Sequence, residues 1–421
     1  MKKTLILLWL FTQMAWAAEP VVLRFSWWGA SDRHEVTQKA LRLFEQRHPG
    51  VRIRAEASAF DQYEDRLAGQ LQAGGEPDVM QINWSWISSY SPRGEGFGDL
   101  YRQRSLLRLD EFTGESFKSG LSFGKLNGLP ASYTAYVFLW QKTTFDRAGI
   151  PLPRTWEQLF LAAQIMREKL GADYYLLDGD PRASYMLSHA YIQQKTGKPY
   201  IYSNQPRIGL THQELLDWVR FHRRLHVEHV IVPHAHRQRL PGRALQQQPE
   251  WVAGRWAGTY TYDSTLRART STLPKATAVE VGDFLSMTGA KNSGMFGRPA
   301  MMLAVSRHSK YPEHASRLVN FLLTDADAAR LLGNTRGIPL ANTAYQVVVP
   351  QLQPYERKAF EQIRAARINY PSPYQEHQAI HALLSDVFVR VGRQQISDDE
   401  AAMRLLDEGN RLLRQLAVRP Q

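Results

Sequence analysis

Hydrophobic positions in the N-terminal part of the chain repeat alternately at the spacing of a strand and at the spacing of a helix. Apolar residues at consecutive or alternate positions predict strands, and apolar residues three and four positions apart predict helices. In chain order, the pattern predicts a strand over residues 21–28, a helix over 32–48, a strand over 51–55, a helix over 63–73 and a strand over 79–82. This βαβαβ order predicts a largely parallel sheet with helices on both of its faces.

The pattern changes after Gly128, where the chain becomes more helical. Strands are predicted over residues 133–140 and 300–305, and helices over 156–170, 184–196, 211–226, 246–256, 312–323, 374–391 and 397–415. The sequence therefore indicates an α/β first part that is followed by a second, more helical lobe.

The first residues have the three parts of a secretory signal peptide in the right order. Lys2 and Lys3 precede an apolar run over residues 5–11, and the small-x-small pattern Ala15-Trp16-Ala17 follows. We therefore expect cleavage after Ala17 and export of the mature chain. Because no later segment has an apolar run of membrane length, we expect the mature chain to be soluble.

The chain of 421 residues contains no cysteine. This excludes disulfides, thiolate metal sites, a cysteine nucleophile and a lipid-modified cysteine at the processing site. A freely diffusing exported protein is useful to its cell only in an enclosed compartment. We therefore expect the periplasm of a Gram-negative bacterium, and secretion into the medium is the alternative.

The net charge is basic, with a formal value of +12. Without Lys2 and Lys3 the mature chain keeps 50 basic and 40 acidic residues, or +10. The basic residues are spread along the chain, with one concentration over residues 220–243, and no nucleic-acid-binding signature accompanies them. We expect no nucleic-acid partner; the charge is typical of a solvated surface and also suits an acidic ligand.

Paired tryptophans follow two of the predicted strands. Trp27 and Trp28 close the first strand, and Asn83-Trp84-Ser85-Trp86 follows the third. In open α/β sheets ligands bind outside the carboxyl ends of the strands, where these four indoles would line one crevice and stack on sugar rings. The alternative is that they pack in the core. Strand alternation predicts that only one tryptophan of each pair faces the ligand.

Basic side chains near these aromatic residues suit the carboxylate of a sugar acid. Arg33 stands at a predicted helix start, where backbone N–H groups also favour an anion, and Lys291 and Arg298 are second choices. The alternatives are solvation for Arg33 and pairing with an acid across the hinge for Arg298. The full set of candidate ligand-binding residues is Trp27, Trp28, Arg33, His34, Asn83, Trp84, Trp86, Ser132, Trp256, Tyr260, Asp263, Lys291 and Arg298.

Histidines in the basic segment raise the question of a metal site. His222 and His226 are four residues apart, so one helix could present both on one face, and His229, His234 and His236 follow. Their arginine neighbours would repel a cation, so the sequence favours a solvated basic helix. We expect no metal and no cofactor.

Several motifs together give the chain a resemblance to a known family. They are the Trp-Trp-Gly strand end, Gly-Glu-Pro-Asp-Val-Met-Gln over residues 75–81, Asn-Gly-Leu-Pro over 127–130, Phe-Asp-Arg-Ala-Gly over 145–149, Pro-Arg-Thr-Trp-Glu-Gln-Leu over 153–159 and Arg-Gly-Ile-Pro over 336–339. In this order they resemble the extracellular solute-binding proteins of sugar ABC importers, the maltose-binding-protein-like group. The resemblance implies two α/β lobes that close on a ligand in the cleft between them.

Within that group the chain is most similar to periplasmic oligogalacturonide-binding proteins. They share patterns like Ser26-Trp27-Trp28-Gly29, Asn83-Trp84-Ser85-Trp86 and Gly289-Ala290-Lys291, whereas Arg298 replaces their lysine. The resemblance implies one lobe over residues 18–132 and 292–345, and a second over 133–291 and 346–421. It also implies an acidic oligosaccharide ligand and the membrane permease of an ABC importer as partners of a monomeric receptor.

Two other functions remain open from the sequence. One is a receptor for neutral oligosaccharides, and the other is a periplasmic polysaccharide-degrading enzyme with a pair of catalytic carboxylates. The sequence has no Gly-x-Ser-x-Gly motif, phosphate loop or dinucleotide fingerprint. We therefore expect a binding protein that performs no chemistry.

Overall fold

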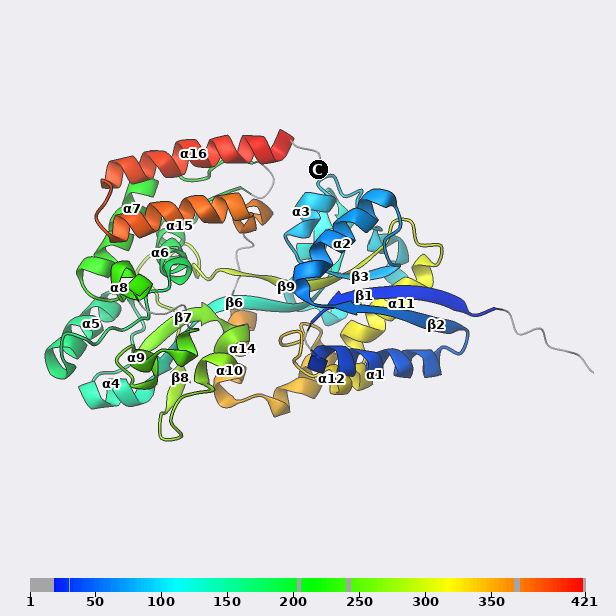
Figure 1. The fold of residues 1–421 in the computed structure, drawn as a ribbon, viewed down its shortest axis with the longest axis horizontal. Helices are drawn as coiled ribbons and strands as arrows, with labels where there is room; N and C mark the ends of the chain where they lie inside the picture. The colour runs from blue at the N-terminus through cyan, green and yellow to red at the C-terminus, as the bar shows by residue number, and fades with distance from the viewer. Residues whose placement is uncertain (1–18, 30, 203–205, 240–243, 367–371, 419–421) are drawn as a thin grey trace, which may run out of the picture.

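The computed structural model describes residues 19–29, 31–202, 206–239, 244–366 and 372–418. The expected signal peptide, residues 1–17, lies outside the described residues. Figure 1 shows two groups of elements joined by long strands: the first lobe, on the right, contains β1, and the second lobe, on the left, contains α7. The molecule therefore has the two-lobe α/β architecture that the resemblance implies.

One continuous sheet runs through both lobes in the order β2-β1-β3-β9-β6-β7, and β8 also pairs with β6. Its strands are β1 (Val21–Trp28), β2 (Val51–Ser58), β3 (Val79–Ile82), β6 (Leu129–Gln141), β7 (Gly258–Tyr262), β8 (Val279–Val281) and β9 (Gly297–Val305). β1 pairs in parallel with β2 and β3, whereas β9 is antiparallel to β3 and β6, and β6 is antiparallel to β7 and β8. The parallel arrangement predicted from the βαβαβ order is therefore confirmed for β1–β3, whereas the later strands pair in antiparallel fashion.

β6 is the strand that joins the lobes. All of its 13 residues are buried. Its first half, Leu129 to Ala135, pairs with β9, and its second half, Tyr136 to Gln141, pairs with β7 and β8. Because β6 leaves the first lobe and β9 returns to it, the two strands run in opposite directions, which explains the antiparallel pairing.

Helices cover both faces of the first-lobe sheet. In Figure 1, α2 and α3 lie on one side of β1 and β3, and α1 and α12 lie on the other side. The elements of this lobe are α1 (Ser31–Arg47), α2 (Phe60–Ala73), α3 (Trp86–Tyr90), η1 (Leu100–Leu106), η2 (Leu109–Glu111), η3 (Thr113–Gly120), β4 (Leu121–Ser122), β5 (Lys125–Leu126), α11 (Pro312–Thr324), α12 (Ala326–Leu332) and the beginning of α13 (Asn342–Val348). η6 (Val349–Gln351) follows α13. α2 ends where Gly74 takes a left-handed conformation, with φ of 66°.

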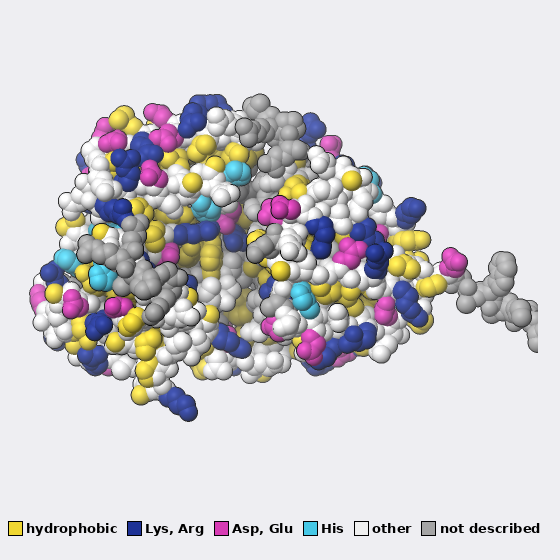
Figure 2. Space-filling model, in the orientation of Figure 1, with side chains coloured by type: hydrophobic (Ala, Val, Ile, Leu, Met, Phe, Trp, Pro, Cys, Tyr) yellow, Lys and Arg dark blue, Asp and Glu magenta, His cyan; other side chains and the backbone are white. Residues whose placement is uncertain are grey.

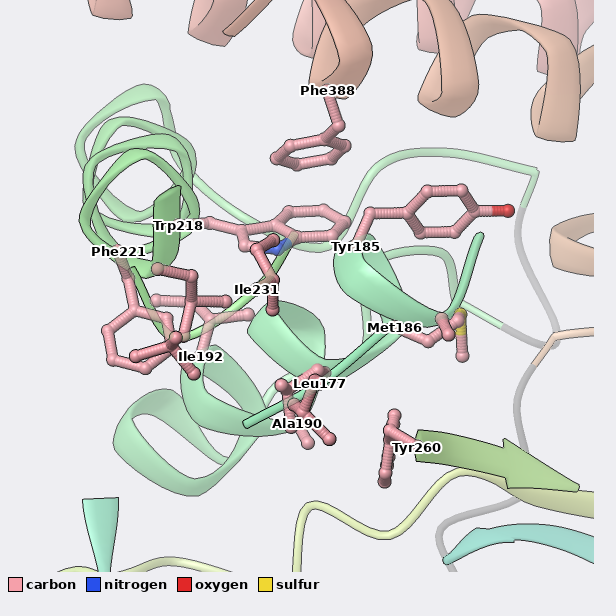
Figure 3. Close-up of a cluster of buried hydrophobic side chains, with 14 of the residues drawn as sticks. Leu177, Tyr185, Met186, Ala190, Ile192, Trp218, Phe221, Ile231, Tyr260 and Phe388 are labelled. Carbon is pink, nitrogen blue, oxygen red and sulfur yellow. The ribbon is translucent and has the colours of Figure 1, made fainter. Parts of the chain in front are cut away.

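The second lobe is mainly helical. Its elements are α4 (Lys142–Ala148), α5 (Trp156–Leu170), α6 (Pro181–Thr196), α7 (His212–Val227), α8 (His234–Arg239), η4 (Leu245–Gln247), α9 (Pro249–Val252), η5 (Asp263–Thr265), α10 (Leu266–Thr270), α14 (Pro354–Ala365), η7 (Pro373–Glu376), α15 (Gln378–Gly392) and α16 (Asp398–Val418). Figure 3 shows its core, where Phe388 of α15 lies over Trp218 of α7, with ring centroids 4.7 Å apart.

Local signals explain why the long helices are close to their predicted bounds. α5 begins after Thr155, whose side chain accepts the backbone N–H of Gln158, and α7 begins with a capping box between Thr211 and Glu214. The predicted helix over residues 246–256 is wrong: η4 and the four-residue α9 occupy it, separated by Gln248. Among the described residues, no helix combines the length and apolar character needed to cross a membrane.

Candidate ligand-binding site

Trp27 and Trp28 lie on opposite faces of β1. Trp27 is fully buried, stacks on Phe25 at 5.0 Å between centroids, and donates its indole N–H to His34 Nδ1 at 3.1 Å. Trp28 belongs to a different cluster and is 9% exposed. Alternation along the strand therefore separates the pair, and Trp27 has no exposed surface in this conformation.

The other strand-end tryptophans join Trp28 in one aromatic cluster. The ring centroids of Trp28 and Trp86 are 5.4 Å apart, and Trp86 stacks on Tyr63 at 6.1 Å. Trp84 donates its indole N–H to the Ser119 carbonyl at 3.0 Å. Trp84 and Trp86 are each only 4% exposed, so these indoles pack largely against one another.

The exposed ring of this cluster belongs to a residue that the sequence analysis did not name. Phe60 is 44% exposed and lies nearly parallel to Trp86, with centroids 6.4 Å apart and planes at 16°. Phe60 is the first residue of α2 and follows directly after the carboxyl end of β2. The tryptophans were chosen as candidates because they also lie at the carboxyl ends of strands. We define Phe60, Tyr63, Trp28 and Trp86 as the aromatic wall.

Arg33 lies close to this wall but uses its guanidinium to hold backbone. Its Nε and one terminal nitrogen donate to the carbonyl of Thr335 at 3.0 and 2.7 Å, and the other donates to the carbonyl of Trp28 at 3.1 Å. Burial lowers the pKa of Arg33, although Asp32 opposes that shift. Arg33 thus ties the end of β1 to the turn before Arg336.

Arg336 organises the turn in which it lies. It donates to Gln81 Oε1 at 2.9 Å and to Thr37 Oγ1 at 2.8 Å, and its carbonyl accepts the hydroxyl of buried Ser132. Burial, and then the charge of Arg33, lower the pKa of Arg336 to about 9. Among the described residues, neither arginine forms an ion pair, so we call Arg33 and Arg336 the unpaired arginines.

Arg298 has a carboxylate partner, as the alternative for it anticipated. Its Nε lies 2.9 Å from Glu376 Oε2, and Arg182 reaches both oxygens of the same carboxylate at 3.2 Å. Burial alone would raise the pKa of Glu376, but nearby His381 and the two arginines hold it at about 2. We call Arg182, Arg298 and Glu376 the paired arginine cluster.

Tyrosines surround the paired cluster. The guanidinium of Arg298 lies 5.5 Å from the ring centroid of Tyr262, and Tyr136 lies 4.2 Å from Tyr262. η7, which carries Glu376, also packs against α3 of the aromatic wall. Figure 2 shows a hollow between the lobes in which Lys or Arg, His and acidic side chains meet. The sequence analysis missed Arg182, Glu376 and these tyrosines, because only the fold brings them together.

The remaining candidate residues differ in how far their side chains are exposed to solvent. Asp263 is buried and accepts hydrogen bonds from the Ala135 N–H at 2.9 Å and the Thr134 hydroxyl at 2.8 Å, while burial raises its pKa to about 6. Trp256 and Tyr260 are 1% and 2% exposed and belong to the core. Asn83 is partly exposed, and Lys291 is exposed.

Comparisons with known proteins agree with this architecture. The family described as "Bacterial extracellular solute-binding protein" matches residues 30–329. A periplasmic oligogalacturonide binding protein from Yersinia enterocolitica is 31% identical over 94% of this chain and 100% of its own, with a TM-score of 0.88. Its complex with saturated digalacturonic acid is 30% identical over 94% and 99% of the two chains, with a TM-score of 0.79.

Two further relatives extend the comparison. A de novo designed cysteine esterase, ECH19, is 30% identical over 96% of this chain and 100% of its own, with a TM-score of 0.91. A protein of Brucella abortus (strain 2308), named as a candidate binding protein, is 25% identical over 142 residues, which are 32% of this chain and only 33% of that relative. The chain belongs to the family of bacterial extracellular solute-binding proteins.

Proposed function

We propose that this chain is the periplasmic receptor of an ABC importer and captures a short acidic oligosaccharide of the galacturonan type between its lobes. The lobes comprise residues 18–132 with 292–345, and residues 133–291 with 346–421. β6 and β9 connect them, which is where a hinge would lie. The receptor acts as a monomer, and the membrane permease recognises its closed form.

The observation that carries the proposal is the excess of partly buried positive charge beside the aromatic wall. Arg33 and Arg336 are hydrogen-bonded only to neutral oxygens in the described structure, and the paired cluster has two guanidinium groups for one carboxylate. An arginine that is partly buried without a carboxylate loses part of its hydration, and an incoming sugar carboxylate would offset that cost with charge-assisted hydrogen bonds.

The aromatic wall supplies the second requirement of a sugar acid. The exposed face of Phe60, backed by Trp86 and Trp28, is a flat apolar surface on which the C–H face of a pyranose ring can pack. The relative from Yersinia enterocolitica, whose name states oligogalacturonide binding, supports the same ligand class for this chain.

Lobe closure is supported by the two structures of that relative. This chain has a TM-score of 0.88 with one and 0.79 with the digalacturonic acid complex. We infer that the present structure corresponds to an open form. Ligand binding then shifts the lobes toward a closed form, which the permease recognises.

We also propose that the protein binds without catalysis. A glycosidase needs a carboxylic acid and a second carboxylate free to act on the bond between them. Two carboxylates in this region already have partners: Glu376 pairs with two arginines, and Asp263 accepts a hydrogen bond from the backbone of β6. The esterase relative is a designed cysteine enzyme, and this chain contains no cysteine.

Titration calorimetry with digalacturonate and its methyl ester tests the ligand class. The proposal predicts binding of the acid and much weaker binding of the ester, which has the same ring without the charge. Equal binding of both would favour a receptor for neutral sugars. Incubation with polygalacturonate tests the absence of catalysis, because new reducing ends or an unsaturated product would identify an enzyme.

A further inference from the structure

Three histidines of the second lobe converge in its interior. His222 and His226 lie one turn apart on α7, and His234 opens α8. Their ring centroids are 5.1 Å (His222–His226), 4.4 Å (His226–His234) and 6.1 Å (His222–His234) apart. One ring nitrogen of each lies within 4.8 Å of the others. The sequence analysis favoured a solvated helix face, but the structure buries this face of α7 against α15.

The open nitrogens of this cluster have no partner. His222 Nε2, His234 Nε2 and both ring nitrogens of His226 are buried without a hydrogen bond in the described structure. Each buried polar atom without a partner costs free energy, and cores seldom contain several in one place. The cluster therefore points to a ligand that accepts lone pairs from imidazole.

In His222 and His234, a hydrogen bond at Nδ1 determines which ring nitrogen carries the proton and leaves the lone pair on Nε2. His234 Nδ1 lies 3.3 Å from the Gly179 carbonyl, which can only accept, so Nδ1 carries the proton and Nε2 the lone pair. His222 Nδ1 lies 3.2 Å from Ser188 Oγ, whose own proton goes to the Tyr185 carbonyl, so His222 also carries its proton on Nδ1. This arrangement is the one that orients metal-binding histidines.

The charged side chains around the three histidines do not prevent a cation from binding, because the two neighbouring arginines of α7 are paired with acids. Arg223, next to His222, pairs with Asp398 at 2.7 Å, and Arg224 pairs with Glu228 at 2.6 Å on the exposed side of α7. Arg393 also faces the cluster and opposes a cation, whereas Asp180 favours one.

Gly392 provides the space for this arrangement. A Cβ at residue 392 would lie 2.5 Å from His226 Nε2, so any side chain there would displace the ring. We propose that His222, His226 and His234 bind one divalent transition-metal ion, with Zn²⁺ preferred, at a site that fastens α7 to the start of α8. Imidazole suits Zn²⁺ and other first-row transition metals, whereas Ca²⁺ requires oxygen ligands.

The test is calorimetry and thermal unfolding of the tag-free mature protein after treatment with a chelator, using ZnCl₂ as the probe. We expect one Zn²⁺ per chain and a higher melting temperature with Zn²⁺ than with the chelator. His226→Gln and His234→Gln should each weaken binding by at least about 100-fold, since even the loss of a residue that only orients a metal-binding histidine costs about 10- to 100-fold.

His236→Gln is the matched control, because residue 236 is exposed on α8 only two positions from His234. It should leave both the stoichiometry and the melting shift unchanged. Absence of saturable one-to-one binding in the wild type would overturn the proposal. Zn²⁺ binding that is unchanged in both His226→Gln and His234→Gln would also overturn the proposal, because the ion would then bind at a different site. CaCl₂ should bind neither the wild type nor the variants at this site.

Discussion

The two groups of arginines in this molecule differ in the groups that compensate their positive charge. In the paired arginine cluster, Arg182 and Arg298 share the carboxylate of Glu376, whose pKa falls to about 2. The unpaired arginines, Arg33 and Arg336, hold their place through neutral oxygens, and burial lowers the pKa of both. The first group contains a counter-charge of its own, one carboxylate for two guanidinium groups, whereas the second contains none and has a charge that a ligand can still neutralise.

This difference predicts that the paired arginine cluster contributes mainly to the stability of the fold, and the unpaired arginines mainly to ligand binding. Removing the carboxylate of the paired cluster should damage the fold, because two guanidinium groups would be left without their counter-charge. Removing a guanidinium from the unpaired group should damage ligand binding more than folding. The predictions below test that separation, beginning with the largest expected effect.

Glu376→Gln should lower the free energy of unfolding by about 3–5 kcal/mol, the usual cost of removing one partner from a buried ion pair. Urea denaturation measures it. Glu361→Gln, at an exposed position of α14, is the control and should change stability little. A loss for Glu376→Gln no larger than that of the control would mean that the paired cluster is not a stabilising unit.

Arg336→Met should weaken binding of digalacturonate by about 1.5–3 kcal/mol, the usual contribution of a hydrogen bond to a charged group. Methionine fills similar space without a charge, so we expect a smaller loss of stability than for Glu376→Gln. Arg330→Met removes a surface arginine of the neighbouring helix α12 and serves as the control. An equal loss of affinity for the acid and its methyl ester would assign Arg336 a purely structural role.

The two buried carboxylates should give opposite pH dependences. Glu376 has a lowered pKa, so its stabilisation is present above its ordinary value of 4.5 and is lost as the pH falls towards 2. Asp263 has a pKa raised from 3.8 to about 6, so the folded state holds its proton more tightly and loses stability as the pH rises through that window.

Asp263→Asn keeps an acceptor for Ala135 and Thr134 but cannot ionise. Relative to this variant, the wild type should therefore become less stable between about pH 4 and pH 6, the window given by ordinary and raised pKa values of an aspartate. Urea denaturation across that range is the measurement. A wild-type curve parallel to that of Asp263→Asn would contradict the raised pKa.

Phe60→Ala should weaken sugar binding by about 0.5–1.5 kcal/mol, the range found for a specific aromatic contact. The effect should be similar for the acid and its methyl ester, because the ring packs on the sugar face that both share. Leu161→Ala, at a residue of α5 that is 54% exposed, controls for loss of surface apolar area. Unchanged affinity in Phe60→Ala would remove the aromatic wall from the site.

Local patterns predicted what depends on neighbours in the chain. The bounds of β1, the placement of Trp27 and Trp28 on opposite faces of that strand, and the α5 and α7 helices follow from periodicity and capping that a few residues encode. The strand-end argument also brought Trp28, Trp84 and Trp86 into one cluster. It did not reveal that they pack mostly against one another and leave Phe60 exposed.

What the sequence could not predict depends on contacts between distant segments. An acid was expected as one possible partner of Arg298. Glu376 lies in η7, at the start of the helix predicted over residues 374–391, and no local pattern indicates that this acid is the one that pairs with Arg298. Likewise, His234 joins His222 and His226 only because the chain turns back after α7. The antiparallel return of β9 was missed for the same reason, since strand direction follows from the path between the lobes.

The most direct test of the account is a calorimetric comparison of digalacturonate with its methyl ester, for the wild type and for Arg336→Met. The account predicts that the wild type strongly prefers the acid and that Arg336→Met loses most of this preference while remaining folded. A wild type that binds both equally, or a variant with the full preference, would contradict the claim that the unpaired arginines receive the ligand carboxylate.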